Sequence, residues 1–464
     1  IKINEMTLIK SISGIRGTLG GKTQTNLTPL DVVLFTSAYA QWLKAQNKGK
    51  LTVVTGRDAR ISGPMVHALV NQTLVGMGVD VIDLDLSTTP TVAVAVPKEA
   101  AQGGIILTAS HNPKEWNALK LLNAAGEFID AKAGATILEM TQNEDFQYAE
   151  VDALGSITSD TTYIEKHIEA TLALQTVNTA AIKNGNFKVV VDGVNSSGGI
   201  AIPKLLEALD VETIQIHCTP NGEFPHNPEP LKEHLGDLCK AVVEHRADFG
   251  IAVDPDVDRL VFVDEKGKHF GEEYTLVACA DYILSKEVGA TVSNLSSTRA
   301  LADVTQKHGG AYTASAVGEV NVVTEMKRIG AIIGGEGNGG VIYPELHYGR
   351  DALVGVALFL SLLVERGLSV AALRSTYPSY FMSKNKITLE EGMDVDAILE
   401  TIARKYKDEK TSTIDGVKID FKDEWVHLRK SNTEPIIRIY TEATNEAAAA
   451  ALASRFVQEI KLLF

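Results

Sequence analysis

The segment TASHNP, residues 108–113, places a small hydroxyl where it can react. It follows the apolar run Gly104–Leu107, which predicts a buried strand, and the pair Asn112–Pro113 predicts a turn because the residue before proline avoids the α region. Ser110 is therefore expected on a loop rather than in a packed core. A hydroxyl that only caps the next helix is the alternative. The segment lacks a G-x-S-x-G elbow, so it does not indicate an α/β-hydrolase.

Three aspartates at alternate positions, Asp254, Asp256 and Asp258, follow the apolar run Phe249–Val253 in AVDPDVDRLVFVD. Neighbouring carboxylates repel one another and favour a hard cation such as Mg²⁺ between them. An EF-hand loop would need glycine where Arg259 stands, and an aspartyl-phosphatase motif would need threonine or valine where Asp258 stands. The pattern predicts a metal-binding loop, and a solvated acidic turn is the alternative.

The segment IIGGEGNGGVIYP contains a G-x-G-x-x-G pattern at 335–340. A dinucleotide-binding fingerprint opens a helix, whereas VIYP here predicts another strand that ends at a proline. We interpret the segment as a loop that presents Glu336 and Asn338 to sugar hydroxyls. Near the N-terminus, GTLGGKT resembles a phosphate-binding P-loop, but Gly17 is one residue away from the required spacing.

The segment HLRKSNTEPIIRIY gathers charged and neutral hydrogen-bond donors in one turn between two predicted strands. The charged guanidinium of arginine can donate two hydrogen bonds to one phosphate, and hydroxyl, amide and backbone N–H groups add neutral donors. The predicted phosphate-binding residues are Arg429, Ser431, Asn432, Thr433 and Arg438. A capped turn between strands is the alternative.

Together, these four loops would provide a reactive hydroxyl, a binding site for a divalent metal, residues that recognise sugar hydroxyls and residues that bind a phosphate. In folds with parallel sheets, such loops gather beyond the carboxyl ends of the strands. The combination predicts phosphoryl transfer on a sugar phosphate, in which the metal offsets charge and positioning provides most of the catalysis.

The elements that position these loops alternate between strand-length apolar runs and stretches of helical period as far as about residue 370. This order predicts mostly parallel sheets with helices on both faces. The predicted strands are 51–55, 79–84, 104–107, 187–191, 213–217 and 332–334, and the predicted helices are 64–76, 200–209 and 353–366. A small α+β domain is predicted last, with strands over 386–389, 416–421, 425–429 and 436–441 and a closing helix over 445–462.

Length and composition limit the class of protein. A chain of 464 residues is too long for one ordinary core, so several domains are expected. The formal charge of −15 argues against a general nucleic-acid binder. Without a long apolar run or a signal-peptide pattern at the start, neither a transmembrane helix nor secretion is predicted. Cys218, Cys239 and Cys279 are too few and too scattered for a disulfide framework or a zinc site, which favours a cytoplasmic location.

The four motifs, in this order, resemble those of the α-D-phosphohexomutase superfamily, which includes phosphoglucomutase, phosphomannomutase and phosphoglucosamine mutase. The resemblance covers nearly the whole chain, and SGIRG at 13–17 is similar to the N-terminal arginine loop of that family. It implies three doubly wound mixed-sheet α/β domains and a C-terminal α+β domain around a central cleft. The implied domains are 1–155 with the phosphoserine loop, 156–258 with the metal loop, 259–375 with the sugar loop and 376–464 with the phosphate loop.

The resemblance also implies a mechanism. Ser110 would carry a phosphoryl group, and one Mg²⁺ would be held by this phosphate and the three aspartates. Transfer to the substrate would give a hexose 1,6-bisphosphate, whose other phosphate returns to Ser110. Arg259 and Lys120 match positions that contact the transferred group or assist proton transfer, and Arg16 matches an arginine of the cleft.

Departures from the family pattern bear on the choice of sugar. Pro255 stands where glycine is frequent, and Asn338 and Gly340 stand where many bacterial members have serine and histidine. This form resembles an archaeal-type subgroup assigned as phosphoglucosamine mutase, which implies interconversion of glucosamine 6-phosphate and glucosamine 1-phosphate. Phosphoglucomutase/phosphomannomutase activity is the alternative within the family, and a phosphosugar-binding protein or a phosphatase is the alternative of another class. The expected partner is a small phosphosugar, with no nucleic acid and no membrane, and the chain is expected as a monomer or homodimer.

Overall fold

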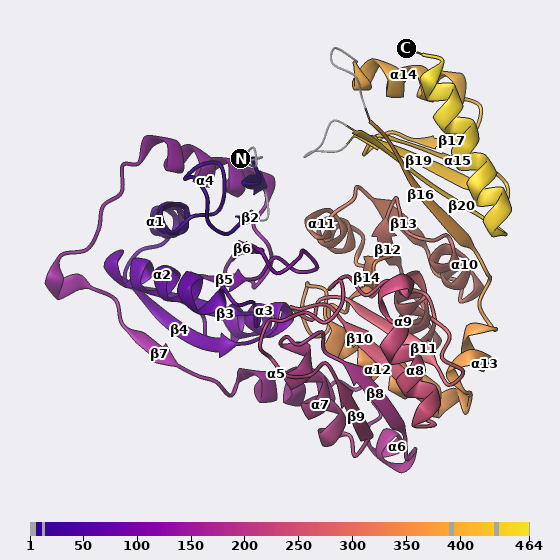
Figure 1. The fold of residues 1–464 in the computed structure, drawn as a ribbon, viewed down its shortest axis with the longest axis horizontal. Helices are drawn as coiled ribbons and strands as arrows, with labels where there is room; N and C mark the ends of the chain where they lie inside the picture. Colours follow the sequence, from indigo (N-terminus) through magenta and orange to yellow (C-terminus); the bar gives the residue numbers. More distant parts are fainter. Residues whose placement is uncertain (1–5, 12–13, 389–393, 431–435, 464) are drawn as a thin grey trace. The chain divides into compact units, whose positions relative to one another are not determined.

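The computed structural model describes residues 6–11, 14–388, 394–430 and 436–463. The chain forms two compact units (Figure 1). The first unit comprises Ile1–Tyr282 and Asn338–Arg374, and the second comprises Ile283–Gly337 and Ser375–Phe464. Among the described residues, no helix is both long enough and apolar enough to cross a membrane.

The first sheet of the first unit has seven strands in the order β1-β2-β6-β5-β3-β4-β7. Neighbours among β5, β3, β4 and β7 are parallel, whereas β6, β2 and β1 join by antiparallel pairs. The strands are β1 Ile9–Ser11, β2 Gly14–Thr18, β3 Leu51–Arg57, β4 Val79–Leu86, β5 Gly103–Leu107, β6 Trp116–Leu122 and β7 Ile157–Ser159.

Helices cover both faces of this sheet, because successive side chains of its buried strands point in opposite directions. Val53 packs into the core beneath α1 Pro29–Gln46, α2 Gly63–Gly76 and α4 Ala131–Asn143. Val54, the next residue, packs into the core on the other face with α3 Thr89–Lys98 and α5 Tyr163–Leu172. Since β3 and β5 are parallel, the loops that follow them lie at the same edge of the sheet.

The second sheet of the first unit has the order β11-β10-β8-β9, with β11 antiparallel to β10 and the other neighbours parallel. Its strands are β8 Lys188–Asp192, β9 Glu212–Ile216, β10 Phe249–Val253 and β11 Leu260–Asp264. The remaining elements of this part are α6 Thr179–Asn184, α7 Gly198–Ala208, α8 Gly236–Glu244, α9 Glu272–Lys286, β15 Gly340–Ile342, α12 Ala352–Arg366, α13 Val370–Arg374 and the 3₁₀ turns Val151–Ala153 and Lys232–His234.

Helix α12 is apolar on nearly all sides, as expected of a helix enclosed by other elements. The Asp351 side chain caps its first turn by accepting from the N–H groups of Leu353 and Val354. Gly367 ends the helix with a φ of 59°, which glycine adopts without steric cost.

The second unit contains two further groups of strands. Strand β12 Thr291–Asn294 pairs in parallel with β13 Tyr312–Ser315 and β14 Ile333–Glu336, beside α10 Ala300–Lys307 and α11 Glu319–Ile329. The C-terminal sheet is antiparallel in the order β16-β20-β19-β18-β17, and α14 Val395–Lys405 and α15 Glu446–Lys461 pack into the core on one of its faces (Figure 1). Its strands are β16 Phe381–Thr388, β17 Lys410–Ser412, β18 Val417–Asp420, β19 Trp425–Lys430 and β20 Ile436–Ala443.

The predicted α/β order with a C-terminal α+β domain is confirmed. The strand interpretation of VIYP is also confirmed, because β15 covers Gly340–Ile342. The first sheet, however, is not mostly parallel. The stretch WNALKLL forms β6, which pairs antiparallel with β5. Strands β2 and β1 then extend the sheet beyond β6 by further antiparallel pairs. One of the two neighbours of β6, β2, lies far away in sequence, and local periodicity did not reveal strand β6.

His427 on β19 joins the two groups of strands in the second unit. Its Nε2 lies 2.7 Å from the carbonyl oxygen of Asp415, and its Nδ1 lies 2.8 Å from the hydroxyl of Ser296. A carbonyl oxygen can only accept, so Nε2 carries the proton and Ser296 donates to Nδ1. Burial lowers the pKa of His427 to about 4.

We expect the free energy of unfolding to fall as the pH drops from about 6.5 to 4, because the unfolded chain protonates His427 while the folded chain does not. A fall of the pKa from 6.5 to about 4 corresponds to at most about 3 kcal/mol. His427→Gln should flatten this dependence in urea unfolding measured across the pH range. The exposed His245→Gln serves as the control, and an equal slope in wild type and His427→Gln would contradict the assignment.

Candidate functional site

Ser110 follows β5 on a turn and faces the aspartate loop. Its backbone φ is 49°, a left-handed value that is uncommon for a residue other than glycine. Its hydroxyl donates to Asp254 Oδ2 at 2.7 Å, and His111 Nδ1 lies 3.3 Å from the same hydroxyl oxygen. The expected loop position is observed, but the side chain is not openly presented, because Ser110 is only 7% exposed.

The carboxylates of Asp254, Asp256 and Asp258 converge at the end of β10. All three residues are fully buried, and one oxygen from each lies within 4.8 Å of the others. The short connection from β10 to β11 forces them together, with Val257 in a left-handed conformation at φ 65°. Asp254 Oδ1 accepts from two backbone N–H groups of this connection, at 3.1 Å each. An oxygen of Asp256 and one of Asp258 are buried without a hydrogen-bond partner.

Two cations from distant parts of the chain offset this charge. Lys120 Nζ on β6 donates to Asp256 Oδ2 at 2.6 Å and lies 3.3 Å from Asp258 Oδ2. Arg350 donates from Nη2 to the same oxygen of Asp258 at 2.7 Å. Arg350 was not among the residues predicted from the sequence, since nothing in GRDAL marks it as a partner of the aspartate loop.

Arg259 and Arg16 add further positive charge. Arg259 Nη1 donates to Glu229 at 3.0 Å, and its Nε lies 3.9 Å from both Asp254 and Asp258. Arg16 on β2 pairs in register with Ala118 on β6, so its side chain leaves the sheet on the same face as that of Lys120. The predicted catalytic residues Ser110, Lys120, Arg16 and Arg259 all belong to the first unit.

The titration behaviour follows from burial and charge. Burial and the neighbouring aspartates raise the pKa of Asp254 well above its usual range. For Asp256, burial is outweighed by the charge and hydrogen bond of Lys120, which lower its pKa. Burial opposes the charge on Lys120, but Asp256 and Asp258 raise its pKa, so the ammonium stays charged. Burial and the charge of Arg259 hold the pKa of His111 well below its usual value, so this imidazole is neutral.

The aspartate loop fits a divalent cation. Carboxylate oxygens are the ligands that hard cations such as Mg²⁺ prefer, and the two unpartnered oxygens of Asp256 and Asp258 would gain a partner from such an ion. Asp254 Oδ2 and the Ser110 hydroxyl lie beside them. A solvated acidic turn, the alternative weighed from the sequence, does not describe these fully buried side chains.

A buried arginine that the sequence did not single out shapes the serine loop. Arg60, which is fully buried, forms an ion pair with Asp58 at 3.0 Å. Its guanidinium donates to the backbone carbonyls of Ser110, Asn112, Pro113 and Trp116. Asp58 also accepts from Thr108 at 2.7 Å. This pair therefore fixes the path of the chain on both sides of Ser110.

Gly340 provides the space through which Arg350 reaches the aspartate loop. A Cβ at position 340 would lie 2.3 Å from Arg350 Cδ and 3.2 Å from Asn338 Oδ1. Many bacterial members of the family have histidine at this position. Glycine here leaves the space that the Arg350 side chain occupies when it pairs with Asp258. Asn338 Oδ1 is buried without a hydrogen-bond partner.

Glu336 belongs to the second unit, where it is only 6% exposed. Its carboxylate accepts from the side chain of Asn294 at 2.8 Å and from the backbone N–H of Gly318 at 3.2 Å. These bonds hold the carboxylate in one orientation at the end of β14. Asn338 is two residues further along the chain and belongs to the first unit.

Three cations lie in a row across the C-terminal sheet. Arg429 on β19 pairs in register with Arg438 on β20, which pairs with Lys386 on β16. Paired residues of a sheet point to the same face, and adjacent like charges there favour an anion between them. Arg429 Nε donates to Asp415, which also accepts from the backbone N–H of Val317 at 3.0 Å. Ser431, Asn432 and Thr433 lie outside the described residues.

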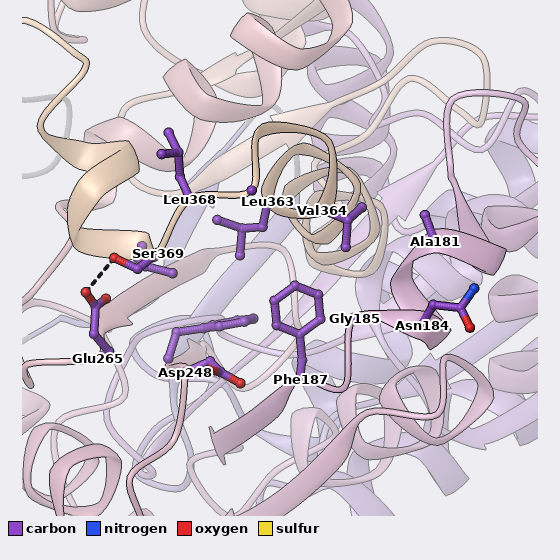
Figure 2. Close-up of a pocket in the computed structure, with 13 residues that line it drawn as sticks. Ala181, Asn184, Gly185, Phe187, Asp248, Glu265, Leu363, Val364, Leu368 and Ser369 are labelled. Carbon is purple, nitrogen blue, oxygen red and sulfur yellow. Dashed lines mark hydrogen bonds between the residues drawn. The ribbon is translucent and has the colours of Figure 1, made fainter.

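A cavity of about 680 Å³ lies elsewhere in the first unit, between α6, the start of β10 and the end of α12 (Figure 2). Its walls are mainly apolar, with Phe187 and Leu363 beside the cavity and Glu265 accepting from Ser369 at its rim. None of the site residues predicted from the sequence lines it. The chemistry of the serine and aspartate loops is therefore separate from this cavity.

Matches to known protein families cover nearly the whole chain. Four phosphoglucomutase/phosphomannomutase families match in order: alpha/beta/alpha domain I at 8–148, domain II at 162–267, domain III at 271–380 and the C-terminal domain at 385–459. The chain belongs to the phosphoglucomutase/phosphomannomutase family. This membership confirms the resemblance to the α-D-phosphohexomutase superfamily and the four-domain architecture, while the exact domain limits stay predictions.

Individual proteins of this family are similar to the chain over nearly its whole length. A phosphoglucomutase/phosphomannomutase of Thermococcus kodakarensis is 35% identical, covering 93% of this chain and 95% of its own. A probable phosphoglucosamine mutase of Methanopyrus kandleri is 32% identical, covering 97% of each chain. A crystal structure of a phosphoglucomutase/phosphomannomutase family protein from Burkholderia thailandensis superposes with a TM-score of 0.85 at 26% identity, covering 98% of this chain and 97% of its own.

Removal of the buried Arg60 guanidinium should destabilise the family fold far more than removal of a surface arginine. Arg60→Ala leaves Asp58 buried without its cation, which costs about 3–5 kcal/mol of unfolding free energy in urea titrations. Arg328→Ala is the matched control, because the Arg328 side chain is 65% exposed and pairs with Glu325 on α11, and such surface pairs contribute only about 0–1 kcal/mol. Equal losses in the two variants would show that Arg60 does not hold the serine loop.

Proposed function

We propose that the protein is a phosphohexomutase that moves a phosphoryl group between the 6 and 1 positions of a hexose, with Ser110 as the carrier. The observation that supports this most directly is the contact of the Ser110 hydroxyl with Asp254, 2.7 Å away in a buried group of three carboxylates. A hydroxyl in this position can receive and release a phosphoryl group next to a divalent cation. The names of the relatives, all mutases, support the same reaction.

Residues of this chain can accept the proton of Ser110 and can bind the charged oxygens of the transferred phosphoryl group. When the Ser110 Oγ–phosphorus bond breaks, the phosphoryl group bonds to a sugar hydroxyl oxygen, and the proton of that hydroxyl is transferred to the released Ser110 oxygen. When the serine is phosphorylated again, its own proton must leave, and Asp254 Oδ2 and His111 Nδ1 are the acceptors beside it. The charged Lys120 and Arg259 lie where they can donate to phosphoryl oxygens.

A divalent ion, which we propose to be Mg²⁺, would be held by Asp254, Asp256, Asp258 and an oxygen on Ser110. Such an ion supplies charge neutralisation to the transferred group. The buried Ser110 hydroxyl beside three carboxylates supports transfer to a bound sugar rather than storage of a sugar phosphate, because a binding protein has no need of such a nucleophile.

Substrate recognition is assigned to residues of the sugar and phosphate loops. Glu336 and Asn338 offer a carboxylate and an amide to the sugar hydroxyls. Arg429 and Arg438, with Ser431, Asn432 and Thr433, bind the phosphate that is not transferred. Arg429 fits this role because Asp415 orients its guanidinium while the neighbouring Arg438 adds a second positive charge.

Glucosamine 6-phosphate is the substrate we propose first, with a hexose 1,6-bisphosphate as the intermediate. The loop sequence Glu-Gly-Asn-Gly-Gly supports it, as does the name of the Methanopyrus relative. Glucose and mannose phosphates are the second candidates, supported by the name of the Thermococcus relative. The ratio of kcat/KM for glucosamine, glucose and mannose 6-phosphates decides between them.

Ser110→Ala should abolish mutase turnover, by at least about 10³-fold, while the protein stays folded, because Ser110 is the described hydroxyl that hydrogen-bonds to Asp254, whereas the hydroxyl of Thr89 is bonded to Asp256. Turnover is followed by ³¹P NMR of the two phosphate positions, together with release of inorganic phosphate. Wild-type protein incubated with the bisphosphate should carry one phosphate on the peptide that contains Ser110.

Ser87→Ala is the matched control for that substitution. Ser87 is also buried in a loop after a strand of the first sheet, and its hydroxyl has no hydrogen-bond partner. It should retain wild-type turnover. Substantial turnover by folded Ser110→Ala would exclude the phosphoserine mechanism, and release of inorganic phosphate without mutase products would indicate a phosphatase.

A further inference from the structure

Two histidines and an aspartate converge in the first unit, outside the site already described. Asp351 Oδ2 lies 2.9 Å from His167 Nε2 and 3.2 Å from His347 Nε2. His167 comes from α5, His347 from the loop before α12, and Asp351 from the N-terminal cap of α12. The side chains of His167 and Asp351 are fully buried, and that of His347 is 8% exposed.

The buried carboxylate of Asp351 requires a positive partner here. Its other oxygen accepts from the N–H groups at the start of α12, so Oδ2 alone faces the imidazoles. A buried carboxylate is stable only when it is paired or bound to a metal.

The geometry matches the ligand set of a tetrahedral metal. All three donor atoms lie within 4.8 Å of one another. Ligands at about 2.0–2.1 Å from a tetrahedral Zn²⁺ lie about 3.3 Å apart, close to the distances from Asp351 Oδ2 to the two nitrogens. The imidazole rings are nearly perpendicular, at 82°, so both can direct a nitrogen at one point without stacking.

The surroundings of His167 also resemble those of a metal ligand. Coordination through Nε2 places the ring proton on Nδ1, and metal-bound histidines normally donate that proton to an acceptor. His167 Nδ1 lies 2.9 Å from the hydroxyl oxygen of Thr91. Thr91 can donate its own proton to Thr88, 2.7 Å away, so its oxygen is available as that acceptor.

We propose that His167, His347 and Asp351 form a second metal site, which binds one transition-metal dication of the Zn²⁺ type. Imidazole nitrogens select such ions, whereas the all-oxygen aspartate loop selects Mg²⁺, so one chain can hold two different metals. The site would tie α5 to the start of α12. Asp351 follows Arg350 directly in the chain. Metal binding at Asp351 would therefore also restrict the position of Arg350, whose guanidinium pairs with Asp258.

The test is zinc binding by the full-length protein, stripped with EDTA and then kept in excess Mg²⁺ to occupy the aspartate loop. Calorimetry with Zn²⁺ should show one site per chain, and Zn²⁺ should raise the melting temperature. Co²⁺ should give the visible absorption of a tetrahedral nitrogen and oxygen site without thiolate bands, which excludes the cysteines. His347→Ala and Asp351→Asn should each weaken binding at least tenfold, and Asp351→Asn can keep the helix cap because asparagine also caps helices.

Two control variants locate the bound metal. His226→Ala removes a different histidine–carboxylate pair, in which His226 lies 3.0 Å from Asp192, and should leave zinc binding unchanged. Asp256→Asn alters the aspartate loop and should also leave it unchanged. No zinc uptake by folded wild type, or uptake that survives both His347→Ala and Asp351→Asn, would overturn the proposal and leave a proton shared among these side chains as the positive partner. Loss of zinc in either control variant would overturn it as well.

Discussion

Three fully buried carboxylates within 4.8 Å of one another are the constraint around which the first unit is arranged. Such a group is unstable alone, because desolvation and mutual repulsion both act against it. Lys120 and Arg350 approach it from elements far away in the chain, and two carboxylate oxygens still lack a partner. A fold with no use for a bound cation would gain stability by losing these side chains. The buried carboxylates with unpartnered oxygens are consistent with a metal-binding site.

Two residues of the site have a left-handed backbone, which is uncommon for residues other than glycine. Ser110 and Val257 both have left-handed φ values, and neither is glycine. Such strain persists only where surrounding contacts fix it. Arg60 provides those contacts for the serine loop, and the bonds from Asp254 to backbone N–H groups provide them for the aspartate loop. Precise placement of a nucleophile relative to charge is what phosphoryl transfer requires of a protein.

Much of this could be predicted from the sequence, because the motifs are local. A hydroxyl after an apolar run and three alternating aspartates after another identified the loops that the structure brings together. Arg60 and Arg350 could not be found in this way, since the carbonyl groups that Arg60 binds in the serine loop and the aspartate that Arg350 binds lie far away in the chain, and arginine is otherwise a common surface residue. Strand β6, which carries Lys120, was also missed; one of its two neighbours, β2, lies far away in the chain. The roles of the sugar and phosphate loops stay predictions, and residues 431–433 lie outside the described part of the chain.

The most direct test of the account is a Mg²⁺ titration by calorimetry of the folded, metal-free protein. Wild type should bind one Mg²⁺ at the aspartate loop, and Asp256→Asn should bind it at least about tenfold more weakly, because one of three charged ligands is lost. Asp160→Asn, at an aspartate that pairs with Lys166 on the surface, should bind Mg²⁺ like wild type. Equal Mg²⁺ affinity in wild type and Asp256→Asn would contradict the claim that the three buried carboxylates exist to hold a metal ion.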